Sequence, residues 1–175
     1  MFATDLNSLA NIAEIVSTLT VVGGAVFAVI QLREFRQQRL DAAAVQLART
    51  FYDSEFAHAV LLLRNLPDDV PAAELRVRGS EFEAAAIKIC TIYETVGLLV
   101  FNDMMSFSMV RELTGGIAVV LWRKLRRWTA DIRAEQSQPS WAEWFQWLAE
   151  QLGAQHESKE AQPAYLRHAK WRPRS

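Results

Sequence analysis

The feature that most constrains this chain is an uncharged segment at residues 15–32, IVSTLTVVGGAVFAVIQL. At about 18 residues it is near the lower length limit for an α-helix that crosses a bilayer. Arginines follow it at positions 33, 36 and 39, whereas no Lys or Arg precedes it. Because basic flanks stay on the cytoplasmic side, we expect the N-terminus outside and the remaining chain in the cytoplasm.

Two other interpretations of this segment stay open. A cleaved signal peptide normally has a basic leading region, which this chain lacks, and the arginines behind the segment resemble a stop-transfer pattern. A buried core helix is also compatible with an apolar run of this length. We prefer the membrane span. The predicted organisation is a short external N-terminus at 1–8, a transmembrane helix at 9–32, a cytosolic helical bundle at 33–153 and a polar, basic, flexible tail at 154–175.

The composition is that of one folded, nearly neutral domain behind the span. Hydrophobic residues make up 51% and charged residues 22%, and the net charge of −1 gives no overall electrostatic attraction to nucleic acid. The single cysteine, Cys90, has no partner for an intrachain disulfide, which fits a reducing compartment. The three histidines are scattered singly, without metal-ligand spacing. We therefore expect no metal and no nucleic-acid partner.

Helical periodicity, without any alternating strand pattern, predicts an all-α fold. Nothing breaks the chain between the span and Pro67, so we expect the membrane helix to continue as one cytosolic helix to about residue 65. Residues 67–79 contain two prolines and a glycine and are predicted to form a loop. The expected fold is one N-terminal transmembrane helix continuing into a cytosolic bundle of about four helices.

The helix after the loop is predicted to cover residues 80–101. Ser80 and Glu83 have the spacing of a capping box, and Asn102-Asp103 is expected to end the helix. One side of it should face the core, through Phe82, Ala86, Ile89, Tyr93, Val96 and Val100.

Two more helices are predicted towards the C-terminus. One covers residues 105–135, where the paired glycines at 115–116 suggest a kink or a close contact with a neighbouring helix. The other covers residues 141–152 and is expected to stop at Gly153.

No motif of a catalytic or cofactor site is present. The chain lacks a Gly-rich phosphate loop, a GxSxG elbow, an HExxH helix and a CxxC pair. Glu94 is the most interesting acid because it lies beside Tyr93 on a core helix, and we expect it to make a structural bond to Arg111, Arg123 or a Trp indole. The sequence predicts no enzyme, no catalytic residue and no cofactor.

Three stretches together carry a resemblance to a known family. They are IAEIVSTLTVVGGAVFAVIQLR at 12–33, IYETVGLLVFNDMMSFSMVRELTGG at 92–116, and LWRKLRRW at 121–128 followed by WAEWFQWLAEQL at 141–152. They resemble a bacterial family of small, N-terminally membrane-anchored, all-helical proteins catalogued only as a domain of unknown function. The resemblance implies one membrane helix and a compact helical domain on the cytoplasmic side of the bacterial inner membrane. It implies no catalytic residues.

One face of the membrane helix carries small and polar residues, spaced alternately four and three: Ala10, Glu14, Ser17, Val21, Gly24, Ala28 and Gln31. Small residues let helices approach closely, and Ser, Gln and Glu can hydrogen-bond across the contact. We expect a homo-oligomer held through Glu14, Ser17, Gly24, Ala28 and Gln31. A ring of such faces would line a polar pore. The other interpretation is that Ala and Gly fall here by chance and that Glu14 lies at the outer interface.

A second feature is WRKLRRW at 122–128, four cations between two tryptophans: Arg123, Lys124, Arg126 and Arg127. Close to a membrane, such residues can contact anionic lipid headgroups. Stacking on single-stranded nucleic acid is disfavoured by the acidic residues around them. The simpler interpretation is a solvated helix face with Trp122 or Leu125 in the core.

Together these features predict a single-pass membrane protein that acts through interaction, as a scaffold, sensor or accessory subunit. Its expected partners are membrane lipid and a second copy of the chain or another membrane-associated protein. The alternative function is a small oligomeric pore-forming or membrane-perturbing effector of a bacterial defence-type system.

Overall fold

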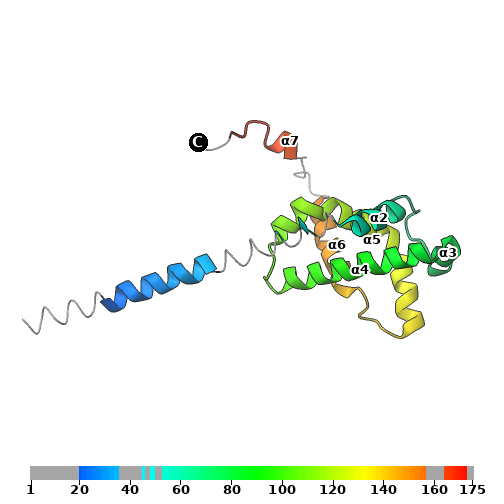
Figure 1. Cartoon of the computed structure of the whole chain (residues 1–175), viewed down its shortest axis with the longest axis horizontal. Coiled ribbons are helices and arrows are strands. Elements are labelled where there is room, and N and C mark those ends of the chain that lie inside the picture. The colour runs from blue at the N-terminus through cyan, green and yellow to red at the C-terminus, as the bar shows by residue number, and fades with distance from the viewer. Residues whose placement is uncertain (1–19, 36–44, 46–47, 50–52, 157–163, 173–175) are drawn as a thin grey trace, which may run out of the picture. The chain divides into compact units, whose positions relative to one another are not determined.

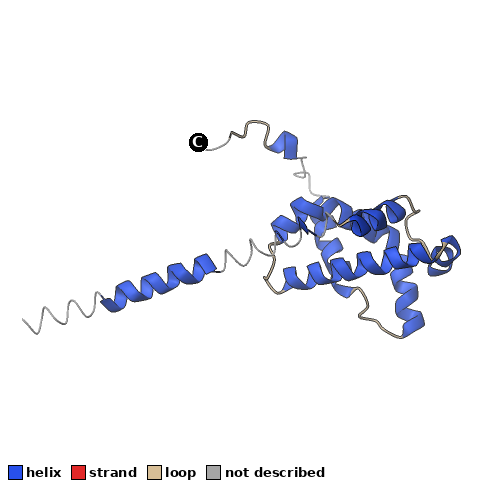
Figure 2. Ribbon diagram, in the orientation of Figure 1, coloured by secondary structure: helices blue, strands red, loops and turns tan. Residues whose placement is uncertain are grey.

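The computed structural model describes residues 20–35, 45, 48–49, 53–156 and 164–172. These residues form helices joined by turns, with no strand among them, so the predicted all-α class is confirmed for this part of the chain (Figure 2). The chain divides into two compact units, Met1–Ala42 and Ala43–Ser175, which are described separately.

In the first unit, residues 20–35 form one helix, blue in Figure 1. All of its side chains are exposed; Val21 is 69% exposed, Phe27 62% and Leu32 71%. The described part of the predicted transmembrane segment is therefore helical. Its first part, residues 9–19, lies outside the described residues.

The second unit is a helical bundle (Figure 1). Its helices are α2 Ser54–Arg64, α3 Ala72–Arg78, α4 Ser80–Phe101, α5 Phe107–Gln136, α6 Glu143–His156 and the short α7 Ala164–Arg167. Helix α4 packs mainly against α2 and α6, and α5 packs against α6, α2 and α3.

The inward side of α4 is the one that the sequence predicts. Phe82 is partly buried against the core, and five residues are at most 7% exposed: Ala86, Ile89, Tyr93, Val96 and Val100. Tyr93 lies at the centre, with its ring stacked on Phe145 at 4.9 Å and its hydroxyl 2.5 Å from the Thr114 hydroxyl. These contacts join three helices, α4, α5 and α6, into one core.

The predicted continuous helix from the span to residue 65 is wrong. Asp53 has extended backbone angles (φ −69°, ψ 123°) and is the N-cap of α2. Its carboxylate accepts a hydrogen bond from the Glu55 N–H at 3.1 Å. Because this bond satisfies one of the free amides of a helix start, a new helix begins at Ser54 although no Pro or Gly marks the break.

The predicted loop at 67–79 contains a short helix, α3. Pro71 precedes it in an extended conformation, and the Asp131 carboxylate of α5 accepts a hydrogen bond from the Ala72 N–H at 3.0 Å. The cap thus comes from a residue far away in the sequence, which explains why local composition predicts only a loop.

The predicted capping box of Ser80 and Glu83 is also wrong. The N-cap of α4 is Gly79, which has a φ of 126°, and no side chain caps this helix. Glu83 instead accepts a hydrogen bond from Arg76 of α3 at 3.1 Å. The tight turn at Gly79 brings α3 and α4 close enough for that pair.

Helix α5 runs without interruption through the paired glycines. A Cβ on Gly115 would lie 3.3 Å from the Leu152 side chain of α6, so the expected close helix contact is confirmed there. Figure 1 shows α5 changing direction between its lime first half and its yellow second half. Helix α6 continues past Gly153 to His156, so the predicted stop at Gly153 is wrong.

One helix among the described residues, Ser80–Phe101, has the length and apolarity of a membrane span, and 44% of its most apolar window is buried inside the bundle. Its inward face packs on the core described above, as expected for a bundle helix. The predicted tail contains α7, whose last residue, Arg167, lies 3.3 Å from Glu112 of α5.

Candidate functional site

The predicted association face falls partly inside the described helix. Gly24, Ala28 and Gln31 are exposed on the helix at residues 20–35, and their spacing of four and three places them on one face. A Cβ on Gly24 would meet no atom within 4 Å, so a second helix can approach the backbone closely there. Glu14 and Ser17, the other two predicted contact residues, lie outside the described residues.

Most of the predicted headgroup-binding cations are paired with carboxylates inside the bundle. Lys124 lies 2.7 Å from Asp68, Arg127 lies 3.0 Å from Asp131, and Arg126 binds both carboxylate oxygens of Asp69. Arg123 is exposed and has no ion pair with a described residue. Trp122 and Leu125 are both buried while the cations lie on the surface. This burial agrees with the simpler interpretation of residues 122–128, a solvated helix face with its apolar residues in the core.

Two of these acids, Asp68 and Asp69, come from the loop between α2 and α3. The N–H of Asp69 donates to the Arg123 carbonyl at 2.9 Å, and the N–H of Val70 donates to the Lys124 carbonyl at 3.1 Å. Hydrogen bonds from Lys124 and Arg126 lower the pKa of Asp68 and Asp69 respectively below the ordinary value. The sequence-based interpretation missed both acids, since only the folded loop brings them to α5.

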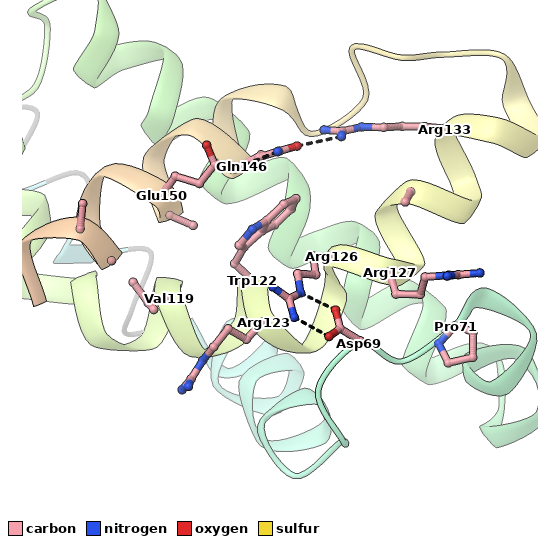
Figure 3. A pocket seen from close by; sticks show the side chains of 14 residues that line it. Asp69, Pro71, Val119, Trp122, Arg123, Arg126, Arg127, Arg133, Gln146 and Glu150 are labelled. Carbon is pink, nitrogen blue, oxygen red and sulfur yellow. Dashed lines mark hydrogen bonds and ion pairs between the residues drawn. The ribbon is translucent and has the colours of Figure 1, made fainter. Parts of the chain in front are cut away.

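A hollow of about 1110 Å³ lies between the second half of α5, helix α6 and this loop; we call it the arginine groove (Figure 3). Its charged and polar lining consists of Asp69, Arg123, Arg126, Arg127, Arg133, Gln146 and Glu150. Three of the four predicted headgroup-binding cations therefore line the same groove. The fourth, Lys124, does not line it and belongs to the ion pair with Asp68.

Arg133 is a groove cation that the sequence analysis did not single out. Its Nε donates to the Trp141 carbonyl at 2.8 Å, and its Nη1 donates to the Gln146 side-chain oxygen at 2.8 Å. Both acceptors are neutral. The sequence did contain a signal for this residue, because positions 123, 126, 130 and 133 lie on one side of a helix by their spacing.

Glu94 binds the start of α6 rather than any of the predicted partners. Its carboxylate accepts a hydrogen bond from the Phe145 N–H at 2.9 Å. Partial burial raises the pKa of Glu94, and the hydrogen bonds from the Phe145 and Trp144 amides partly oppose that rise. The expected bond to Arg111, Arg123 or a Trp indole is thus corrected to a cap on the free amides at the start of α6.

Metal ligation and thiol chemistry can be assessed for the described residues. No group of three or more His, Cys, Asp or Glu among them could hold a metal ion. Cys90 is fully buried, and burial raises the pKa of its thiol to about 12, so its thiolate is scarce at neutral pH. The Thr129 hydroxyl lies beside this thiol and has no oxygen or nitrogen partner among the described residues.

The sequence model of a domain of unknown function, DUF4760, matches residues 18–152. The chain belongs to the DUF4760 family. No curated protein and no protein of solved structure matches it. The DUF4760 match begins inside the apolar segment and ends close to Gly153, so the family pattern includes the exposed helix, the arginine groove and the start of α6. The tail lies outside that pattern, as the resemblance implies.

Proposed function

We propose that this DUF4760 protein is a single-pass, membrane-anchored helical interaction protein with its bundle on the cytoplasmic side. One observation carries the proposal, the exposure of the helix at residues 20–35. It has no charged residue before Arg33, and its large apolar side chains are about half exposed or more: Val21, Val22, Val26, Phe27, Val29, Ile30 and Leu32. Soluble proteins rarely leave an apolar surface of this kind uncovered, whereas lipid covers it at no cost.

The bundle supports an interaction role rather than a chemical one. Several of its charged side chains form surface ion pairs, such as Arg76 with Glu135 and Lys88 with Asp53. The arginines at 33, 36 and 39 support a cytoplasmic position of the bundle by the basic-flank rule, and a free Cys90 agrees with it.

Membrane extraction tests the anchor. We expect the full chain to remain in the membrane pellet after washing with alkaline carbonate, and a chain starting at Arg33 to be released. Replacing Val22 and Val26 with lysine should also release the protein, because each lysine costs about 3 kcal/mol near the centre of a bilayer.

The matched control for these lysines lies in the bundle. Leu61 and Val77 are 57% and 88% exposed on α2 and α3, so lysine at both positions should leave the protein in the pellet. Release of the unmodified full chain by carbonate would refute the anchor. Because Cys90 is buried, single cysteines at Ser8 and Ser175 can report orientation, with an impermeant maleimide expected to label only the first.

We further propose that copies associate through the face of Gly24, Ala28 and Gln31. We expect light scattering to give a discrete oligomer for the detergent-extracted full chain and a monomer after leucine replaces these three residues. Leucine lacks the small size and the polar group that let helices pack closely in lipid.

Leucine at Val26 and Ile30, on the opposite face, is the control and should leave the oligomer intact. An oligomer that survives both sets of changes would place the contacts in the bundle and refute this face. The alternative function, a pore, requires in addition that the same three changes abolish ion conductance in planar bilayers.

A further inference from the structure

The arginine groove contains a cation, Arg133, that forms no ion pair with a described residue. Arg133 is partly buried, and the acceptors of its two side-chain hydrogen bonds, the Trp141 carbonyl and the Gln146 side chain, are neutral. Among the described residues, no carboxylate lies within ion-pair distance of it. A cation held partly away from water and fixed by neutral acceptors gains strongly from a bound anion.

The same groove holds a second fixed guanidinium, that of Arg126. Asp69 binds it through both carboxylate oxygens, which positions it and leaves further N–H groups unused. In the view of Figure 3, the Trp122 ring lies between Arg126 on one side and Gln146 and Arg133 on the other, while Arg123 and Arg127 point outward to opposite sides. Two oriented guanidinium groups thus line the groove, one on each side of an aromatic ring in this view.

Short side chains keep this centre open. Ala130 of α5 and Ala149, Gly153 and Ala154 of α6 line the groove, and a Cβ on Gly153 would meet no atom within 4 Å. The resulting volume, about 1110 Å³, exceeds that of a single phosphate and is comparable with the larger small-molecule sites of proteins. A ligand there has room for one or two phosphates and for an attached organic group against Trp122.

We propose that the arginine groove binds a phosphate-bearing ligand, with Arg133 and Arg126 contacting the phosphate and Trp122 contacting the attached group. Guanidinium groups match phosphate oxygens in geometry, and partial exclusion of water strengthens the contact. The phosphate can belong to an anionic lipid headgroup at the membrane or to a soluble molecule. This binding activity goes beyond the anchoring and association proposed above and does not depend on them.

Three charge changes test the groove in opposite directions. Arg133→Gln should weaken binding about tenfold, the value of one charge-assisted hydrogen bond. Asp69→Asn should tighten binding several-fold, because it removes a competing anion from Arg126, and asparagine tolerates the φ of 58° at this position. Arg78→Gln removes one positive charge on α3, outside the groove, and should change nothing.

The measurement is calorimetric titration of the full chain in neutral detergent. One arm uses inorganic pyrophosphate, and the other uses phosphatidylglycerol added to the micelles, with phosphatidylcholine as the uncharged comparison. We expect saturable binding in at least one arm, with affinity falling as NaCl rises. Binding of pyrophosphate without competition from phosphatidylglycerol assigns a soluble ligand, and the opposite pattern assigns a headgroup.

The proposal fails if neither probe binds, or if Arg78→Gln weakens binding as much as Arg133→Gln does. It also fails if Asp69→Asn weakens binding, because a purely structural role for this loop predicts that direction. Since Asp69→Asn and Arg133→Gln move affinity in opposite directions, general unfolding cannot reproduce the expected pattern. Arg123→Gln changes an exposed cation on the rim of the groove and removes no ion pair with a described residue. It therefore tests the rim charge separately from the charge of Arg133.

Discussion

Replacing Gly97 with alanine is expected to destabilise the bundle by about 3 kcal/mol, because the new methyl group has no room. A Cβ at this position on α4 would lie 2.3 Å from the Trp144 carbonyl oxygen and 2.8 Å from its carbonyl carbon. Both atoms are backbone, so no rotamer change relieves the overlap and α6 must move away from α4. The motion would also disturb the Glu94 bond to Phe145.

Gly116→Ala is the matched control for this change. Gly116 lies in the interior of α5, and a Cβ there would meet no atom within 4 Å. Alanine should therefore stabilise the protein by about 0.5–1 kcal/mol through helix propensity alone. Thermal unfolding followed by circular dichroism in detergent should give a midpoint roughly 10 °C lower for Gly97→Ala and slightly higher for Gly116→Ala. Equal midpoints for the two variants would contradict the tight α4–α6 contact.

The elements that the sequence predicts well are those set by local periodicity. The inward side of α4 follows from apolar spacing alone, because a helix with one buried stripe must repeat its apolar residues every three or four positions. The buried Trp122 and Leu125 follow from the same rule applied to α5. The end of α4 at Phe101 was also predictable, since Asn102-Asp103 is a common helix stop and Asp103 has a φ of 54°.

Helix boundaries set by distant residues could not be predicted. The start of α3 depends on Asp131, about sixty residues away in the sequence, and the start of α6 depends on Glu94. A single sequence contains no signal for such pairs. Gly153 led to a predicted helix end that the structure does not have. A glycine ends a helix only when nothing favours continuation, and here α6 packs along α5 through Leu152.

In the candidate site, too, the sequence predicts features set by local spacing and not those set by contacts between distant residues. The sequence identified Arg123, Arg126 and Arg127 as a cationic surface, and the structure places all three in the arginine groove. It could not identify Asp68 and Asp69 as the partners of Lys124 and Arg126, because the pairing requires the α2–α3 loop to dock on α5. Among the described residues, this pairing leaves the exposed Arg123 and the partly buried Arg133 as the groove arginines without an ion pair.

Glu94→Leu is expected to destabilise the protein by about 2 kcal/mol, because it leaves the amides of Trp144 and Phe145 without an acceptor at the start of α6. Glu94→Gln keeps an acceptor oxygen in the same place and should cost far less. A difference between the two in urea unfolding isolates the capping bond from the loss of charge. Equal destabilisation by both would show that the carboxylate acts through its charge.

The pH dependence of the same pair provides a second test. Partial burial raises the folded-state pKa of Glu94 above its ordinary value of 4.5, so the folded state binds this proton more tightly than the unfolded state does. The corresponding stability is fully present below pH 4.5 and is lost as the pH rises through the raised pKa. Glu94→Gln lacks this titration, so its stability relative to the unmodified protein should increase from pH 4 to pH 7. A constant difference over that range would show that burial does not govern this carboxylate, and the capping bond alone would then account for the position of α6.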